Sequence, residues 1–252
     1  MTQQPPPKRR NVVLVAGGRF HDIDFARLEL LKLLAEDERN RVRVFEDYRD
    51  LDALRAAEVL VTYTCDVMPA LHEQEALRAW LEAGGRWLAL HGTNAILRIL
   101  KDGVDSPRWA PHLMQTLGSQ FVAHPPIQPY RVEVADPGHP LVEGVQPFDA
   151  DDELYLSEYH GDLHVLLDTH WPGGEATGFF EKDWPQARHP VFYVKRHGAG
   201  AVLYLTLGHC RGHYDMGDFG MDYYPVVERG SWALPVYYEL LRRGLRWTAE
   251  RG

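Results

Sequence analysis

Three histidines follow segments that we expect to be β-strands, where their side chains would emerge at the edge of a sheet. His91 ends one expected strand and is followed directly by Gly92, and His209 leaves the end of another. His21 follows the loop after the first expected strand. Imidazoles ligate metal ions and transfer protons near neutral pH. Each histidine could instead only hold a loop in place, but the repeated placement favours a functional cluster.

A carboxylate for such a cluster is available in the acidic segment Asp149–Glu153. Runs of acidic residues are usually solvated surface, but Glu153 leads into an apolar stretch that would hold it in place. We predict that His91, Glu153 and His209 are the catalytic residues and the ligands of a divalent metal such as zinc. Two imidazoles and one carboxylate leave a fourth position open for a substrate.

Other polar side chains lie in the same expected strand-end loops or close to Glu153. A role in loop hydrogen bonding stays open for each of them. Those that we predict to bind substrate are His21, Asp22, Thr93, Asn94, His124 and Tyr155.

Several common catalytic motifs do not occur in the sequence. There is no H-E-x-x-H, no C-x-x-C, no G-x-S-x-G elbow and no P-loop. Gly17-Gly18 is too short a match for a dinucleotide fingerprint, so no nucleotide cofactor is expected. The two cysteines, Cys65 and Cys210, cannot form a disulfide framework and fit a reducing compartment.

The first half of the chain alternates strand and helix patterns, which predicts a doubly wound, parallel α/β sheet. In such sheets ligands bind beyond the carboxyl ends of the strands. Asp24 is a plausible N-cap of the first helix. The expected strands are Asn11–Ala16, Val42–Phe45, Val59–Tyr63 and Arg86–Leu90, and the expected helices are Phe25–Leu34 and His72–Ala83.

The second half is less regular and contains a long excursion, Arg211–Trp232, of the length typical of lids and binding loops. No linker divides the chain, so we predict one domain over residues 11–252 after a disordered leader, residues 1–10. The expected elements are strands at Tyr130–Ala135, Val165–Asp168, Val191–Lys195 and Val202–Thr206, and a helix at Leu234–Trp247.

The charge and hydrophobicity of the sequence limit the kinds of partner that the protein is expected to bind. The net charge of the 252 residues is −9 and the basic residues are scattered, which argues against a nucleic-acid surface. No segment approaches the roughly 20 apolar residues of a membrane-spanning helix. We therefore expect a cytoplasmic protein with a small-molecule partner, with neither nucleic acid nor membrane, and a homo-oligomer stays open.

Several short segments together resemble the ThuA-like family, named for trehalose utilisation. The resemblance runs from about Val12 to Trp247, and it depends on the order and number of its pieces. These pieces are Leu88–Thr93, Phe121 with His124-Pro125, Asp136 with His139-Pro140, Asp152–Tyr155, His189-Pro190, Leu203–His209 and Gly244–Trp247.

The resemblance implies a fold similar to class I glutamine amidotransferases, a flavodoxin-like three-layer sandwich with a mainly parallel central sheet. Those enzymes carry a nucleophilic cysteine on the turn that here reads His91–Asn94, where Thr93 replaces it. His209 falls near the position of their histidine, but Cys210-Arg211 follows it instead of proline and glutamate. Amidotransferase chemistry is therefore disfavoured.

For function, the resemblance implies carbohydrate metabolism, with trehalose, a related disaccharide or a keto-sugar as ligand. One hypothesis is an enzyme, a metal-assisted lyase, isomerase or hydrolase. The alternative is a non-catalytic sugar-binding or regulatory module. A thiol hydrolase using Cys210 ranks last. Aromatic residues in Tyr214–Trp232 would either stack on sugar rings or pack within the long loop.

Overall fold

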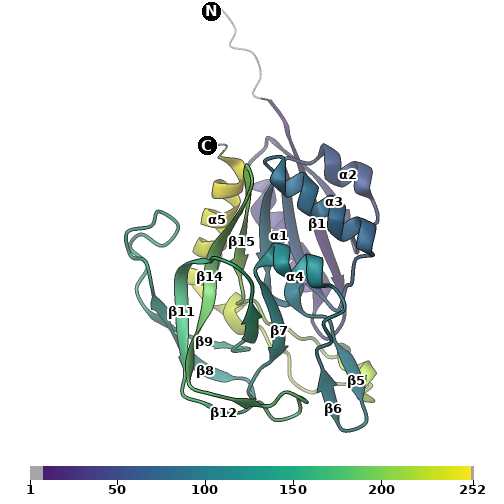
Figure 1. The fold of residues 1–252 in the computed structure, drawn as a ribbon, viewed down its shortest axis with the longest axis vertical. Helices are drawn as coiled ribbons and strands as arrows, with labels where there is room; N and C mark the ends of the chain where they lie inside the picture. The colour runs from purple at the N-terminus through teal and green to yellow at the C-terminus, as the bar shows by residue number, and fades with distance from the viewer. Residues whose placement is uncertain (1–7, 251–252) are drawn as a thin grey trace, which may run out of the picture.

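A nine-stranded mixed sheet forms the centre of the protein in a computed structural model that describes residues 8–250 (Figure 1). In spatial order its strands are β2 (Asn40–Phe45), β1 (Arg10–Gly18), β3 (Val59–Cys65), β4 (Arg86–Leu90), β15 (Gly200–Leu205), β14 (Ala187–His197), β11 (His164–Trp171), β8 (Gln128–Val134) and β9 (Phe148–Asp152).

The first five strands in this order pair in parallel. Every residue of β3 and β15 is buried, as expected for strands covered on both faces. In Figure 1, β1 runs downward from the N-terminal end, so the carboxyl ends of the parallel strands lie at the bottom of that view. The strands predicted in both halves of the chain are confirmed, with shifted ends.

The expectation of a mainly parallel sheet is wrong for the second half. From β15 through β14, β11 and β8 to β9, each pairing is antiparallel. The β14–β15 connection explains the change, since Gly198 and Ala199 alone separate the two strands. A loop this short can only form a hairpin, because a parallel return needs a crossover of a dozen or more residues.

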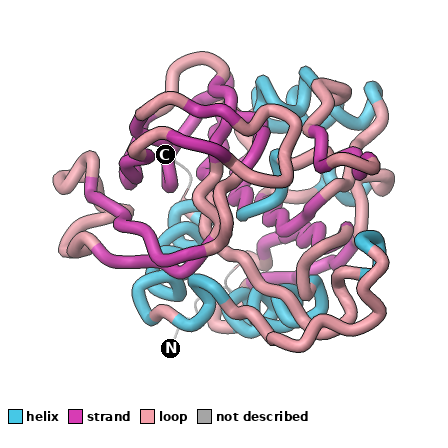
Figure 2. Tube along the Cα trace, turned by 90° about the horizontal axis from the view of Figure 1, so that it is seen from below, coloured by secondary structure: helices cyan, strands magenta, loops and turns pink. Residues whose placement is uncertain are grey.

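Helices pack on both faces of the parallel strands (Figure 2). In α1 the buried residues Ala26, Leu30, Leu33 and Leu34 recur at helical spacing and face the sheet. Its N-cap is Asp22 rather than the expected Asp24, because the Asp22 carboxylate accepts from the backbone of Phe25 at 3.1 Å. One face carries α1 (Ile23–Ala35) and α5 (Pro235–Ala249), and the other carries α2 (Leu51–Ala56), α3 (Leu71–Glu82) and α4 (Pro111–Leu117).

Three two-stranded ribbons stand apart from the main sheet. The β5–β6 hairpin is held against residues 176–180, because Val104 and Gly178 share a backbone hydrogen bond of 2.8 Å and Phe180 donates to Val104 at 3.0 Å. The ribbons are β5 (Arg98–Leu100) with β6 (Gly103–Asp105), β7 (Ser119–Ala123) with β10 (Leu156–Tyr159), and β12 (Gly174–Glu175) with β13 (Asp183–Trp184).

The N-terminal boundary differs slightly from the prediction. Arg10 already belongs to β1, where it pairs with Asn40 of β2, so the strand begins inside the expected leader of residues 1–10. Residues 1–7 of that leader lie outside the described residues. Between residues 8 and 250, no helix is long and apolar enough to span a bilayer.

Candidate metal centre

His91 is fixed by the turn that follows β4. Its backbone is left-handed, with φ of 45°, and the chain turns sharply over His91–Asn94. Gly92 allows this turn because a Cβ there would lie 2.7 Å from the carbonyl oxygen of Thr64. His91 Nδ1 lies 2.9 Å from the Thr206 carbonyl, which can only accept a hydrogen bond. The Nε2 atom of neutral His91 is therefore a free lone pair.

His209 follows β15 and is held from two sides. Its Nε2 lies 2.7 Å from Glu228 Oε2, and its backbone N–H donates to Asp152 at 3.1 Å. Its Nδ1 lies 3.0 Å from Glu153 Oε1 but makes no hydrogen bond of good geometry, although it is buried. A carboxylate on one nitrogen that leaves the other free is the usual arrangement of a metal-ligating histidine.

Glu153 reaches the histidines because the end of β9 is fastened to their loops. The neighbouring Asp152 is 1% exposed, and its carboxylate accepts from the backbone N–H groups of Gly208 and Ser231, each at 3.0 Å. It also accepts from the backbone of Glu153 itself at 2.8 Å. Asp152 thus joins three separate segments of the chain around the site.

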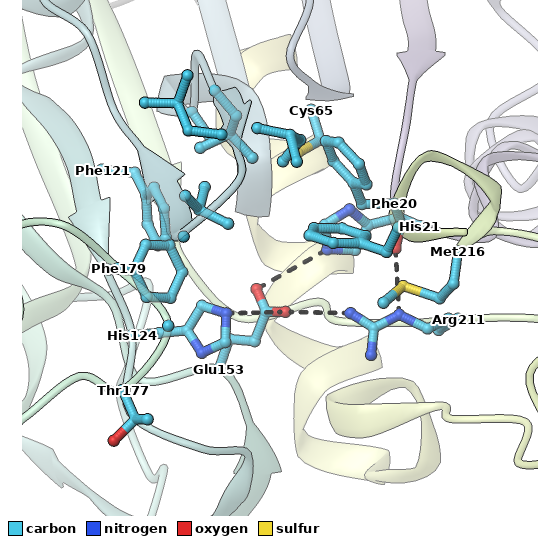
Figure 3. A pocket seen from close by; sticks show the side chains of 18 of the residues that line it. Phe20, His21, Cys65, Phe121, His124, Glu153, Thr177, Phe179, Arg211 and Met216 are labelled. Atoms are coloured by element: carbon cyan, nitrogen blue, oxygen red, sulfur yellow. Dashed lines mark hydrogen bonds and ion pairs between the residues drawn. The ribbon is translucent and has the colours of Figure 1, made fainter. Parts of the chain in front are cut away.

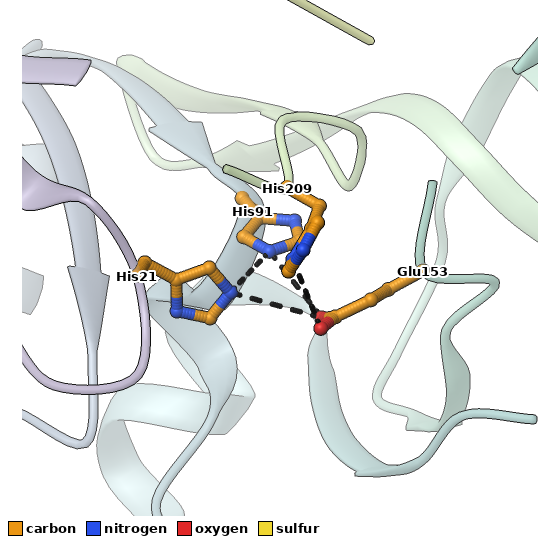
Figure 4. Close-up of side chains that lie close together, drawn as sticks. All are labelled: His21, His91, Glu153 and His209. Carbon is orange, nitrogen blue, oxygen red and sulfur yellow. Dashed lines mark hydrogen bonds and ion pairs between the residues drawn. The ribbon is translucent and has the colours of Figure 1, made fainter. Parts of the chain in front are cut away.

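The four side chains His21, His91, Glu153 and His209 converge on one point (Figure 4). Each offers a ligand atom, and these atoms all lie within 4.8 Å of one another. His91 Nε2 is 2.8 Å from His21 Nε2 and 3.4 Å from Glu153 Oε2. The three predicted catalytic and metal-binding residues therefore lie together, and His21, predicted to bind substrate, joins them.

The contact between His21 and His91 tests whether these residues fit a cation. His21 Nδ1 faces the Arg19 carbonyl at 3.3 Å, as His91 Nδ1 faces that of Thr206. Both Nε2 atoms are then lone pairs at 2.8 Å, an arrangement that repels unless a proton or a metal ion lies between them. The free Nδ1 of His209 and the Glu153 carboxylate face the same point. The donor set therefore fits a zinc-like ion.

The pKa values describe the centre without an ion, in which His209 carries a proton that a bound ion would displace. Burial lowers the pKa of His21 to about 4, against the opposing influence of Glu153, so its imidazole is neutral at pH 7. Burial also acts to lower the pKa of His209, but the nearby Glu153 and Glu228 carboxylates outweigh it and raise the value to about 9. Although burial opposes ionisation of Glu153, its neighbours His124 and His209 hold its pKa well below the usual range.

A cavity of about 450 Å³ opens onto this centre (Figure 3). His21 and Glu153 lie at its floor together with His124, Tyr155 and Arg211. His124 Nε2 is 3.6 Å and Arg211 Nη2 is 3.8 Å from Glu153 Oε1. Of the residues predicted to bind substrate, His21, His124 and Tyr155 therefore face the cavity.

The other three predicted substrate-binding residues do not line this cavity. Asp22 caps α1 and forms an ion pair of 3.0 Å with Arg229. Thr93 is buried and donates to the Leu90 carbonyl at 2.7 Å, and buried Asn94 donates to Ser119 at 2.7 Å. Their side chains hold the surrounding loops, as the alternative reading allowed.

Sequence reasoning missed three residues of the site. Asp152 was included in an acidic run that was interpreted mainly as solvated surface. Arg211 and Glu228 fall in the irregular excursion, where no pattern distinguished them. Their backbones pair at 3.0 and 2.9 Å, and Arg211 Nη1 lies 2.8 Å from Glu228 Oε2.

Neither cysteine is suited to nucleophilic catalysis. Both are buried and free. Burial raises the pKa of Cys210 to about 12 and that of Cys65 well above its usual range, so both stay protonated at neutral pH. Within the aromatic excursion, Phe219 lines the cavity, whereas Tyr214 and Tyr223 are exposed and pack near His213.

Fold and site together define an α/β protein with a buried His/Glu centre at the carboxyl ends of its parallel strands. The sequence profile of the ThuA family, described as trehalose utilisation, matches residues 11–221. The chain therefore belongs to the ThuA family. No curated protein matches its sequence.

Solved structures agree with this assignment at the level of the fold. A putative ThuA-like protein from Bacteroides uniformis has a TM-score of 0.67 and 18% identity, over 98% of this chain and 94% of that one. A second from Parabacteroides merdae has a TM-score of 0.62 and 16% identity, over 96% and 90%. A β-galactosidase from Rahnella sp. R3 matches over 97% of this chain but 32% of its own, with a TM-score of 0.52 and 14% identity.

Proposed function

We propose that the protein is a metal-dependent enzyme of carbohydrate utilisation that acts on a sugar or keto-sugar related to trehalose. The observation that carries this proposal is the convergence of four ligand atoms within 4.8 Å of one another, at a centre whose His21 and Glu153 line a cavity. Membership of a family described as trehalose utilisation supports the substrate class.

The residues that would hold the ion are His21, His91, Glu153 and His209. This extends the set predicted from the sequence by His21. A bound divalent ion would act as a Lewis acid toward a carbonyl or hydroxyl oxygen of the substrate.

His124 is the best candidate for a general base. Its Nδ1 lies 2.7 Å from the Pro125 carbonyl and donates to it, which leaves Nε2 as a lone pair beside the cavity. Such a nitrogen can remove the proton next to a keto group and return it elsewhere, as lyase and isomerase reactions require. Burial raises the pKa of Tyr155 well above its usual range, so its hydroxyl remains a hydrogen-bond donor to a sugar oxygen.

We also propose a fold type, the exclusion of two chemistries and a cellular location. The parallel strand order β2-β1-β3-β4-β15, with helices on both faces, supports a flavodoxin-like, amidotransferase-related arrangement for that half. Thr93 on the nucleophile turn and the protonated Cys210 argue against amidotransferase and thiol chemistry. A cytoplasmic location suits two free cysteines.

Metal content and turnover together test the proposal. Protein loaded with zinc and then dialysed is expected to retain about one equivalent and to convert a keto-disaccharide, whereas His91→Ala retains little zinc. His164→Gln, at an exposed histidine that pairs with Asp136, is the matched control and should retain zinc. Retention of less than a tenth of an equivalent of zinc by the unaltered protein would contradict the proposed metal centre. Zinc and saccharide binding without turnover would favour the sugar-binding module instead.

A further inference from the structure

The cavity above the centre has two chemically different parts. Its floor carries the polar groups already described. Its wall is apolar and comes from four separate segments of the chain, contributing Leu97, Ile99, Val104, Phe121, Phe179 and Phe219. Figure 3 shows Phe121 and Phe179 on one side and Phe20 on the other, with Glu153 and His124 between them at the floor.

The apolar wall is a packed part of the structure. Phe121 lies 5.7 Å from Phe179 between ring centroids, and Phe20 lies 5.3 Å from Phe219. Leu97 and Ile99 pack against the small core formed around Phe121. Two backbone hydrogen bonds hold the β5–β6 hairpin to residues 176–180, which fixes Val104 beside Phe179. The wall is therefore preformed.

A second sugar ring is a poor match for this wall. Each ring of a disaccharide carries several hydroxyl groups, and burying a hydroxyl without a partner is unfavourable. Away from the floor, Lys101 and Thr177 are the lining side chains of the described residues that could meet such hydroxyls. An aromatic ring or an alkyl chain needs no such partners and gains from leaving water.

We propose that the wall binds an apolar aglycone, an inference that rests on the proposed function. The substrate class is then a glycoside, or keto-glycoside, of a phenol or an aliphatic alcohol. Its sugar ring lies on the His/Glu floor and its aglycone against the β5–β6 hairpin and Phe179. Disaccharides bind more weakly, since their second ring meets the same wall.

Glucosides that share one sugar and one anomer isolate the aglycone. Binding of methyl, butyl, hexyl and phenyl α-D-glucoside and of trehalose is measured calorimetrically with zinc-loaded and zinc-free protein. Affinity is expected to rise about fourfold for each methylene until the wall is covered. Phenyl glucoside should bind more tightly than trehalose. A flat alkyl series, trehalose binding as tightly as phenyl glucoside, or no binding of the hexyl and phenyl compounds would overturn the proposal.

A conservative pair of variants shows where the preference arises. Val104→Thr keeps the shape of the side chain, adds a hydroxyl to the wall and should reduce the preference for phenyl glucoside over trehalose about fivefold. Val226→Thr makes the same change at an exposed position that does not line the cavity and should leave the preference unaltered. Equal behaviour of the two variants contradicts the assignment. Because binding is also measured without zinc, failure of the metal centre would appear as lost zinc content and turnover, with the alkyl series intact.

Discussion

The parallel and antiparallel halves of the sheet meet at β15 and β14, and they supply different parts of the centre. The parallel half supplies three imidazoles, His21, His91 and His209, each from a loop after a strand. The antiparallel half supplies the carboxylate of Glu153, at the end of β9. The centre therefore exists only when both halves are correctly joined.

Different interactions hold the histidines and Glu153 in position. Carboxyl ends of parallel strands share one edge of a sheet, so side chains from loops after β1, β4 and β15 meet without further help. Glu153 comes from the far edge strand β9, and it is held there by the Asp152 carboxylate bonded to the loops at Gly208 and Ser231. Variants that change one contribution at a time should therefore have different effects.

The largest effect is expected from removing the charge that the antiparallel half contributes. Glu153→Gln keeps the shape but removes the anionic ligand from the four-residue set, since Glu228 contacts the other nitrogen of His209. Because loss of an outer hydrogen-bond partner of a metal ligand already costs about 10–100-fold in metal affinity, loss of this ligand should cost on the order of a thousandfold. Zinc competition with a chromophoric chelator measures it. Glu158→Gln, at a carboxylate paired with Arg108, is the control, and equal affinities for the two variants would contradict the assignment.

Asp152→Asn should weaken the hydrogen bonds that hold the two halves together, and this effect can be measured as a loss of stability in the absence of zinc. An amide cannot accept all the backbone hydrogen bonds that the Asp152 carboxylate accepts, so the free energy of unfolding should fall by roughly 3 kcal/mol. Urea unfolding of zinc-free protein measures this change. Asp151→Asn alters the exposed neighbouring residue and should change stability by less than about 0.5 kcal/mol. A stable Asp152→Asn variant would show that the loops are held in another way.

Glu228 tests the orientation of a ligand from the parallel half. Its carboxylate holds Nε2 of His209, so Glu228→Gln should weaken zinc binding about 10–100-fold and leave the bound stoichiometry at one. The same chelator competition measures this zinc affinity, with Glu239→Gln on the surface of α5 as control. An unchanged zinc affinity would mean that His209 is oriented without Glu228.

The smallest effect concerns a buried histidine of the antiparallel half, His189 on β14. Among the described residues no carboxylate pairs with it, and burial lowers its pKa to about 4. It therefore takes up a proton below about pH 6.5 only after unfolding, so stability should fall as the pH drops from 6.5 to 4. His189→Gln should remove about 1–2 kcal/mol of this fall in zinc-free protein. The exposed control His170→Gln should leave the pH dependence of stability unchanged. The same unchanged pH dependence in His189→Gln would contradict the role of His189.

Local patterns in the sequence predict the parallel half well. Continuous apolar runs gave β1, β3 and β15, and the strand-end rule led to His91 and His209. Thr93 and Asn94 follow the same rule, yet the tight turn at Gly92 directs them into the interior. Spacing alone cannot tell which residues of such a turn face the cavity.

The antiparallel half depends on contacts between distant segments, which local patterns do not encode. Residues 149–152 are alternately exposed and buried because they belong to the edge strand β9, so Asp149 and Asp151 face solvent whereas Asp152 is buried. The acidic composition of this segment resembles a solvated loop, so Asp152 was not recognised. The short helices α2 and α4 and the small ribbons were missed for a related reason, since tertiary packing stabilises such short elements more than their own propensity.

An anomalous difference map at the zinc absorption edge, from crystals of zinc-loaded protein, would locate the bound metal directly. We expect one strong peak bound by His21 Nε2, His91 Nε2, His209 Nδ1 and a Glu153 carboxylate oxygen, at distances of about 2.0–2.2 Å. A map without a peak among these four side chains, or with the zinc bound only by surface residues such as His139 and His164, would contradict the proposed metal centre.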